Sequence, residues 1–544
     1  MLLAFAQSGL CSWLDVVSRP QPKLENTLTD SFTGALPASG GSNIRGWGEN
    51  NPIADMTSDP TDVDSNALTN LVIFLRFADD EEIDHPFANI DSMFNGRTPG
   101  YLSIYNFYDA LSYGRIHYNT VYTNNIQNGT IISYQDIMPR CYFQPYDSVE
   151  NPIGYLPEEQ PFMGVSMREA ELLGRAVRYV DSLHLVSSSV VLDGDGDGDI
   201  DNISFIVKGG TGEWASILWP HMEFFPHDSL SYTVTLNGVR PNTFNFEFEG
   251  AGSTLFNALV FRHEMGHSLK MPDLYHYINY TYISSAGNWD MMEGSYVCNQ
   301  TAAIYKNKIL HVADDPIEIT ADGDYTLLSA GSSPTQNCYY IRSAIDSTQW
   351  FVLEYRRQAD LFEDGLPGTG LIVARWNDTV PTGYYGMFAN GFFDFYTQAN
   401  QYWIFRPGSA IDTVQGDIAQ AHFSSATGRT SFGPTTDPHP YLTDGTPETS
   451  FEITNIQENG TELTFHVHFL NTEGIEKPVT DRLAVSVRNG RIVVDGADSE
   501  TVQVFDMVGR HTQTFKHSGT QALPNGVYLV RIGDHPAKKV VIMR

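Results

Sequence analysis

The sequence of 544 residues is short of positive charge and of long apolar runs. It contains 32 Lys and Arg against 65 Asp and Glu, a formal net charge of −33, and such a charge repels phosphate backbones. Nucleic acid is therefore a poor candidate partner. The strongest apolar run, Leu71–Phe77, contains Arg76 and is far shorter than the roughly 18 to 20 residues that span a bilayer. We therefore expect no transmembrane segment.

Cysteine is also scarce. The four cysteines lie far apart, allow three pairings and form no CxxC motif, so they do not identify a redox compartment. What the chain has in quantity is apolar surface, with 41% hydrophobic and 12% aromatic residues. These values exclude wholesale disorder and, at this length, indicate several packed domains.

One short segment carries the clearest chemical signal. Residues 257–269, N-A-L-V-F-R-H-E-M-G-H-S-L, have the composition of a packed helix. His263 and His267 are four positions apart and therefore share one helical face, where both imidazoles can bind one Zn²⁺. Glu264, next to His263, can reach a water molecule at that ion. The sequence therefore predicts an H-E-x-x-H zinc site with Glu264 as the general base.

A catalytic zinc needs a third protein ligand and one open position. Asp273, directly after Pro272, is the first candidate. Glu293 and Asp290 remain alternatives, because they follow in a segment, G-N-W-D-M-M-E-G, that can form a tight turn beneath the metal.

H-E-M-G-H-S-L-K-M-P-D-L-Y together with G-N-W-D-M-M-E-G-S resembles the immune inhibitor A family of secreted, metzincin-like zinc proteases. Trp219-Pro220-His221 and W-F-V-L-E-Y-R-R-Q are also similar to that family, and the likeness covers roughly residues 66–380. The resemblance implies that His263, His267 and Asp273 bind zinc and that Met292 is the Met-turn residue. Lys270 departs from the family pattern, which usually has glycine there.

The expected reaction is peptide-bond hydrolysis of protein or peptide substrates. Zn²⁺ polarises the scissile carbonyl, and Glu264 takes a proton from water and passes it to the leaving amine. Tyr296 is a candidate to stabilise the oxyanion, with a packing role as the alternative. A catalytically inactive, calcium-stabilised surface adhesin remains the alternative function, although an intact Glu264 favours the enzyme.

A second candidate metal site alternates carboxylates with glycines. Several hard oxygens can converge on one Ca²⁺ in such a loop, and without a cation the carboxylates repel one another. The spacing fits the first half of an EF-hand loop, but position twelve is Ser204 rather than Glu. A solvated acidic turn is the alternative. The candidate calcium ligands are Asp193, Asp195, Asp197, Asp199 and Asp201.

The expected fold class is α+β, a metzincin-like protease domain followed by a β-sandwich and a small C-terminal Ig-like β-sandwich. Patterns of hydrophobicity predict a buried strand over residues 68–77 and helices over 105–111, 167–185 and 257–269. The predicted parts of the chain are a signal-peptide remnant (1–7), a pro-segment or linker (8–65), the protease (66–314), the β-sandwich (315–475) and the C-terminal module (476–544). Cys11 in the pro-segment is a candidate zinc ligand in a zymogen.

The C-terminal module differs in charge from the rest of the chain. It has 10 Lys and Arg against 7 Asp and Glu, and its short alternating runs predict a β-sandwich. V-Q-V-F-D-M-V-G-R, L-P-N-G-V-Y-L-V-R-I and K-K-V-V-I-M-R resemble the sorting domain of type IX secretion cargo. The resemblance implies the type IX secretion machinery as a partner and a secreted or surface-attached protein that has crossed the inner and outer membranes.

Overall fold

The computed structural model describes the chain from residue 67 onward, with gaps. The described residues are 67–160, 164–210, 217–251, 254–255, 258–275, 283–294, 296–380, 400–470, 484–488, 491–495, 501–506, 510–516, 521–522, 524, 526–533 and 538–542. The predicted signal-peptide remnant, the predicted pro-segment and Cys11 lie outside this part of the chain. Cys141 is disulfide-bonded, and Cys298 and Cys338 are free.

The chain divides into two compact units, Met1–Leu470 and Asn471–Arg544. Helices and sheets occur together, so the broad α+β class is correct. Among the described residues, no helix has the length and apolarity needed to cross a membrane.

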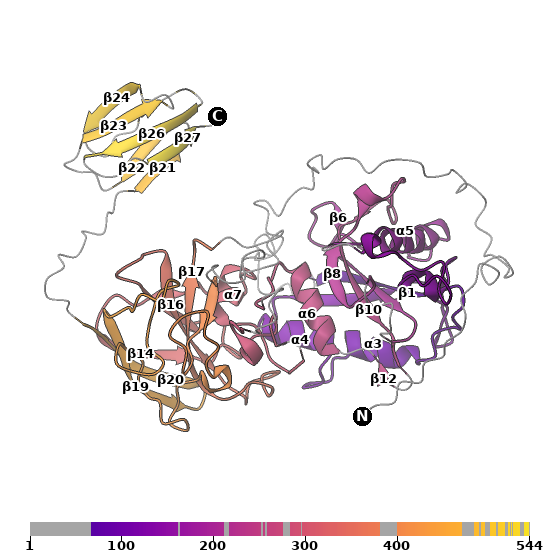
Figure 1. Cartoon of the computed structure of the whole chain (residues 1–544), viewed down its shortest axis with the longest axis horizontal. Coiled ribbons are helices and arrows are strands. Elements are labelled where there is room, and N and C mark those ends of the chain that lie inside the picture. Colours follow the sequence, from indigo (N-terminus) through magenta and orange to yellow (C-terminus); the bar gives the residue numbers. More distant parts are fainter. Residues whose placement is uncertain are drawn as a thin grey trace. The chain divides into compact units, whose positions relative to one another are not determined.

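The first unit begins with a mostly parallel sheet (Figure 1). The sheet order is β2 (His117–Tyr122), β1 (Ala67–Arg76), β7 (Asn202–Val207), β10 (Thr243–Phe248) and β8 (His221–Phe224), and β5 (Tyr134–Gln135) also pairs with β1. The pairs β1–β2, β1–β7 and β7–β10 are parallel, whereas β8 runs antiparallel to β10 and ends the order. The predicted strand over 68–77 is confirmed as β1.

Helices cover both faces of this sheet, because β1 is apolar on both sides (Figure 1). Val72 and Phe74 face the core formed with α3 (Phe87–Asn95), α4 (Ile104–Leu111) and α6 (Ala258–Ser268). Alternate residues, such as Ile73, face the core formed with α5 (Met167–Ser182). Helices are therefore confirmed in all three predicted places.

The end of α5 differs from the prediction. The hydrophobic pattern continues to residue 185, but the helix ends at Ser182. His184 has a φ of +51°, which reverses the chain just beyond the helix. The N–H of Leu185 still donates to the carbonyl of Val180, so Leu185 remains packed against the end of α5 without belonging to it.

The described strands between residues 317 and 470 form two sheets. One has the order β13 (Ile317–Glu318), β15 (Cys338–Arg342), β16 (Gln349–Arg356), β17 (Gly370–Asn377) and β18 (Tyr402–Ile404). The other has the order β14 (Gly323–Leu328), β20 (Glu462–Phe469) and β19 (Phe451–Asn459). Side chains from both sheets, including Phe351 and Phe451, share one hydrophobic core.

The opposite face of β16 and β17 packs toward the first sheet's helices. Val352 and Ile372 belong to the same hydrophobic core as Phe261 and Met265 of α6. Residues of α7 (Ala303–Lys308) belong to this core too, and α7 lies beside β16 and β17 in Figure 1. One continuous core therefore crosses the position between residues 314 and 315, where the sequence predicts a domain boundary.

The second unit contains a three-stranded and a four-stranded sheet. The three-stranded sheet has the order β21 (Ala484–Arg488), β22 (Arg491–Asp495) and β25 (Gln521–Ala522). The four-stranded sheet has the order β24 (His511–Lys516), β23 (Thr501–Asp506), β26 (Gly526–Ile532) and β27 (Lys538–Ile542). Val502 and Val504 are buried, and so is Val530 on the neighbouring strand β26. The strands expected from the alternating runs are present.

Candidate active site

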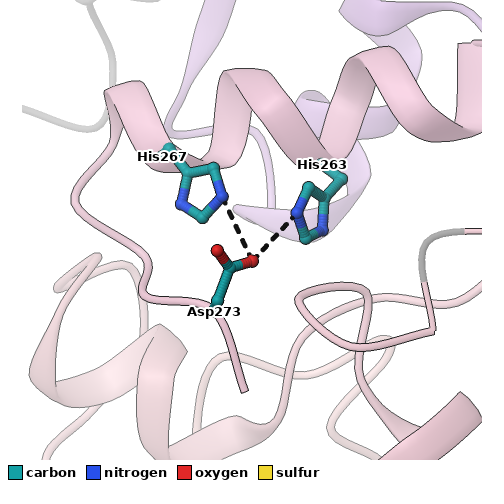
Figure 2. Close-up of side chains that lie close together, drawn as sticks. All are labelled: His263, His267 and Asp273. Carbon is teal, nitrogen blue, oxygen red and sulfur yellow. Dashed lines mark ion pairs between the residues drawn. The ribbon is translucent and has the colours of Figure 1, made fainter. Parts of the chain in front are cut away.

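His263 and His267 project from the same face of α6 toward Asp273 in the loop that follows (Figure 2). The Nε2 atoms lie 3.1 Å and 3.3 Å from Oδ1 of Asp273, for His263 and His267 respectively. All three residues are buried, and their ligand atoms lie within 4.8 Å of one another. Two imidazole nitrogens and one carboxylate oxygen are a donor set that suits Zn²⁺ and leaves a fourth position for water or substrate.

Backbone carbonyls orient both imidazoles. Nδ1 of His263 lies 2.8 Å from the carbonyl oxygen of Met291, and Nδ1 of His267 lies 2.8 Å from that of Met271. When each Nδ1–H donates to its carbonyl, each Nε2 faces Asp273 with its lone pair available for a metal. The two carbonyls therefore hold the ring orientation that metal binding needs and favour the tautomer protonated at Nδ1.

The charges of the triad match those of a cation site. Burial alone lowers the pKa of His267, but the carboxylate of Asp273 raises it to about 9. Burial alone raises the pKa of Asp273, but the two histidines lower it below its usual range. A buried carboxylate of this kind needs positive charge beside it. The histidines supply that charge here, and a bound divalent cation would take over the same role.

A left-handed residue ends α6 and brings Asp273 to the histidines. Lys270 has a φ of +69°, its N–H donates to the carbonyl of His267 at 2.8 Å, and the N–H of Met271 donates to that of Gly266 at 3.1 Å. These two bonds form a Schellman motif. Lys270 therefore adopts the positive φ that usually favours glycine, at a cost of roughly 1 kcal/mol.

Glu264 lies beside the edge strand β8. Its Oε2 accepts a hydrogen bond of 3.0 Å from the N–H of Met222 on that strand. The carboxyl group is buried, and burial raises its pKa above the usual range. The hydrogen bond therefore holds Glu264 in place. Its raised pKa makes the carboxylate a stronger base, which suits proton transfer.

Three methionines pack against α6 between the two histidines. A Cβ at Gly266 would lie 2.8 Å from Cε of Met271 and 3.0 Å from both Cε of Met291 and Sδ of Met292. Glycine therefore permits this close approach. Met292, the predicted Met-turn residue, lies beneath the helix, and Met291 provides the carbonyl that orients His263.

The two alternative carboxylates stabilise the turn instead of joining the triad. Glu293 accepts from the N–H groups of Ala286 at 2.6 Å and Gly287 at 2.8 Å. Asp290 accepts from the N–H of Met292 at 2.8 Å and that of Ala302 at 2.7 Å. Asp273 is therefore the carboxylate that the structure brings to His263 and His267.

The predicted oxyanion group lies apart from this buried arrangement. The side chain of Tyr296 is 76% exposed, and we find no hydrogen bond or ring contact from it to the triad in the described part of the chain. Tyr275, which sequence reasoning missed, instead stacks on His263 with ring centroids 6.3 Å apart. The sequence contained a clue to this contact, because Tyr275 follows the candidate zinc ligand Asp273 by two positions.

A further buried histidine, His221, lies on β8. Nε2 of His221 is 3.2 Å from Oε1 of Glu169 on α5, and its Nδ1 lies 2.5 Å from the carbonyl of Trp219. Burial alone lowers the pKa of His221, but Glu169 raises it to about 9. His221 therefore forms a buried pair with Glu169, next to the residue that hydrogen-bonds Glu264.

The acidic loop brings three of its five predicted ligands together. Carboxylate oxygens of Asp193, Asp195 and Asp197 lie within 4.8 Å of one another. Asp201 instead accepts from the N–H groups of Thr69 at 2.7 Å and Gly194 at 2.9 Å, and Asp199 lies outside the cluster of three. The loop thus offers hard oxygen donors, which Ca²⁺ prefers.

Carboxylates of this loop hold protons more strongly than usual. Burial, followed by the charge of Asp197, raises the pKa of Asp195 to about 6. Burial raises the pKa of Asp201 to about 7. Ionisation of these carboxylates is therefore unfavourable, and a divalent cation would neutralise the negative charge that results.

Comparison of the chain with models of known protein families gives no match, and comparison with curated proteins gives no significant match.

Proposed function

We propose that this protein is a secreted zinc endopeptidase that hydrolyses peptide bonds of extracellular proteins. The observation that carries the proposal is the buried triad of His263, His267 and Asp273, with Nε2 atoms 3.1 Å and 3.3 Å from one carboxylate oxygen. Glu264 occupies the sequence position between them that H-E-x-x-H proteases use for a general base.

The residues divide the chemistry between them. His263, His267 and Asp273 would hold Zn²⁺, which when bound supplies a Lewis acid that polarises the scissile carbonyl and lowers the pKa of water. Glu264 accepts the proton of the attacking water and delivers it to the leaving amine. Its burial raises its pKa, which makes it a stronger base than an exposed carboxylate.

The edge strand β8 supports a binding mode for an extended substrate. The N–H of Met222 donates to Glu264, so this edge of the strand lies at the general base. β8 is the last strand in the order of its sheet. A peptide that pairs with this edge would lie next to Glu264, and main-chain hydrogen bonds would contribute to its binding.

Calcium is the second proposed cofactor, with a structural role. Asp193, Asp195 and Asp197 would supply its carboxylate ligands. The loop leads through β6 (Asp199–Ile200) into the central strand β7, so a bound ion would stabilise the sheet on which α6 packs.

The family assignment and the route of export belong to the same proposal. The zinc motif and the Met-bearing turn support a metzincin-like protease of the immune inhibitor A type. The two-sheet region supports a β-sandwich, and the C-terminal strands support an Ig-like sorting domain for the type IX secretion machinery. We therefore propose a secreted or surface-attached protein.

Glu264→Gln tests the enzymatic proposal, because it keeps an acceptor for the N–H of Met222 but removes the base. The purified protein, freed of residues 1–65, and the variant should each hold one zinc by elemental analysis. Casein hydrolysis should fall by roughly 10² to 10⁴ in the variant. Glu448→Gln is the matched control, since Glu448 is also a buried carboxylate but belongs to the 317–470 region, and it should keep activity.

Two results would contradict the proposal. If the wild-type protein binds no zinc, the triad is not a zinc site. If it holds one zinc and cleaves no unfolded protein, the inactive surface adhesin becomes the better account.

A further inference from the structure

Three buried arginines donate hydrogen bonds to the backbone of one segment, residues 283–294 and 296–300, which we call the turn segment. Arg262 belongs to α6, Arg356 ends β16, and Arg406 follows β18. All three side chains are among the largest that are fully buried. Two of the three arginines come from the 317–470 region and not from the part of the chain that carries the H-E-x-x-H helix.

Arg356 makes two of these contacts. Its Nη1 donates to the carbonyl of Trp289 at 2.7 Å, and its Nη2 donates to the carbonyl of Gln300 at 3.2 Å. Nη2 also donates to both carboxylate oxygens of Glu363 at 2.8 Å. Arg356 and Glu363 are each 1% exposed, so the guanidinium is held in a fixed position.

The two carbonyls lie on either side of Met291. The carbonyl of Gln300, which accepts from Arg356, also accepts from the N–H of Met291 at 3.3 Å. The carbonyl of Met291 lies 2.8 Å from Nδ1 of His263. A continuous path of hydrogen bonds therefore runs from Glu363 through Arg356 and the turn segment to His263.

We propose that Arg356 is a positioning residue for the metal centre and that the 317–470 region completes this centre from outside the H-E-x-x-H part of the chain. Arg356 holds the backbone on both sides of Met291, and Met291 in turn orients the imidazole of His263. The inference rests on the proposed function insofar as the triad binds zinc.

The geometry distinguishes this role from general stabilisation. A buried ion pair contributes little net stability compared with an apolar pair of similar size, so stability alone does not explain Arg356 and Glu363. Groups that orient a metal ligand typically change metal affinity by 10- to 100-fold when they are removed. Arg356 acts one step further out, through a backbone carbonyl, and should have a smaller effect.

Arg375 provides a matched control. It is fully buried in the adjacent strand β17 and pairs with Asp412, with Nη2 and Oδ2 2.5 Å apart. Its pairing with a carboxylate is similar to that of Arg356, but none of its hydrogen bonds in the described structure reaches the turn segment. Arg356→Lys and Arg375→Lys each keep the charge and lose the planar fork.

The experiment compares the two variants in the full chain by zinc-chelator competition, by the absorption spectrum of the cobalt-substituted protein and by thermal unfolding. Arg356→Lys should raise the zinc dissociation constant by roughly 3- to 10-fold and shift the cobalt spectrum. It should lower kcat more than it changes KM. Arg375→Lys should lower the unfolding temperature to a similar degree and leave the zinc dissociation constant within about twofold of the wild type.

Equal zinc affinities in the two variants at equal stability would overturn the proposal. If Arg356→Lys does not fold, R356M/E363M removes both charges together and takes its place in the same comparison. Absence of zinc binding in the wild-type protein would contradict the proposed function itself, whereas normal wild-type binding with unchanged affinity in the Arg356 variant would contradict only this inference.

Discussion

The two candidate metal sites differ in what holds their ligands in place. The zinc triad is buried, and carbonyls of Met271 and Met291 orient its histidines. The acidic loop is partly exposed, and its carboxylates bond largely to the loop's own backbone. Gly198 donates to Asp193, for example, at 3.0 Å. One site is therefore built by the fold, and the other is built by a short stretch of sequence.

This difference predicts that zinc supports catalysis, whereas calcium supports the stability of the fold. Tertiary packing orients the triad before any ion binds, so loss of zinc should remove activity and leave the fold. Above about pH 7 the loop collects negative charge that a bound cation would neutralise, so loss of calcium should weaken the fold. Lys270, just beyond the end of α6, is the residue through which the loop's charge reaches the zinc side: burial lowers its pKa, and the charges of Asp195 and Asp197 oppose that shift.

The largest expected effect concerns the third ligand of the triad. Asp273→Asn replaces a carboxylate with a neutral amide and should weaken zinc binding by more than the roughly 10- to 100-fold that is typical of outer groups. Chelator competition and elemental analysis measure this change. The metal-free variant should still fold but should unfold at a lower temperature than the metal-free wild type, because it loses the buried pairing of Asp273 with His263 and His267.

Glu293→Gln is the control for Asp273→Asn, since Glu293 is the other carboxylate considered as a ligand. It should lower stability through the N–H groups of Ala286 and Gly287, while the protein still binds one zinc. Loss of zinc in Glu293→Gln together with retention in Asp273→Asn would reverse the assignment.

A moderate effect is expected when calcium is removed from the acidic loop. An ion at 100 times its dissociation constant stabilises a fold by about 2.7 kcal/mol. A calcium-selective chelator should therefore lower the unfolding temperature by several degrees, as measured by calorimetry, and Asp195→Asn should abolish most of this dependence. Zinc content should not change in either case.

Asp199→Asn is the matched control within the loop, because Asp199 lies outside the cluster of Asp193, Asp195 and Asp197. It should keep most of the calcium response. If the unfolding temperature of the wild type does not respond to calcium, the solvated acidic turn is the better interpretation of the loop. The fold would then depend on a metal ion at neither site.

Local patterns were sufficient to predict the parts of both sites that depend on local geometry. The i, i+4 spacing of His263 and His267 and the alternation of Asp and Gly in the loop each bring their side chains together. The choice among Asp273, Asp290 and Glu293 could not be derived from spacing. It depends on the positive φ of Lys270 and on where the carboxylates of the turn segment find N–H donors.

Long-range contacts account for what the sequence did not predict. Arg356 ends a strand whose pattern looks like ordinary β-structure, and its contact with the turn segment joins residues 56 and 67 positions apart. The core that crosses residues 314 and 315 likewise forms only when β16 and β17 pack on α6 and α7. Composition and periodicity carry no signal for such pairings.

The smallest expected effect is a dependence of the unfolding temperature on pH, and it tests whether the acidic loop needs a bound cation. Burial raises the pKa of Asp201 to about 7, whereas in the unfolded chain it is about 3.9. Between these values the folded state binds more protons, so the stability associated with Asp201 is present below about pH 4 and is lost as the pH rises through about 7. Calcium-free wild type should therefore become less stable across this window relative to Asp201→Asn.

Thermal unfolding of the two proteins in chelator, at several values between pH 4 and pH 8, measures this difference. Asp201→Asn keeps a side-chain oxygen for the N–H groups of Thr69 and Gly194, so the two unfolding temperatures should agree near pH 4 and separate by a few degrees at most near pH 8. Saturating calcium should reduce the separation, because the ion favours the ionised carboxylates around it. A constant separation at every pH would mean that Asp201 is ionised throughout, and that the loop tolerates its charge without a cation.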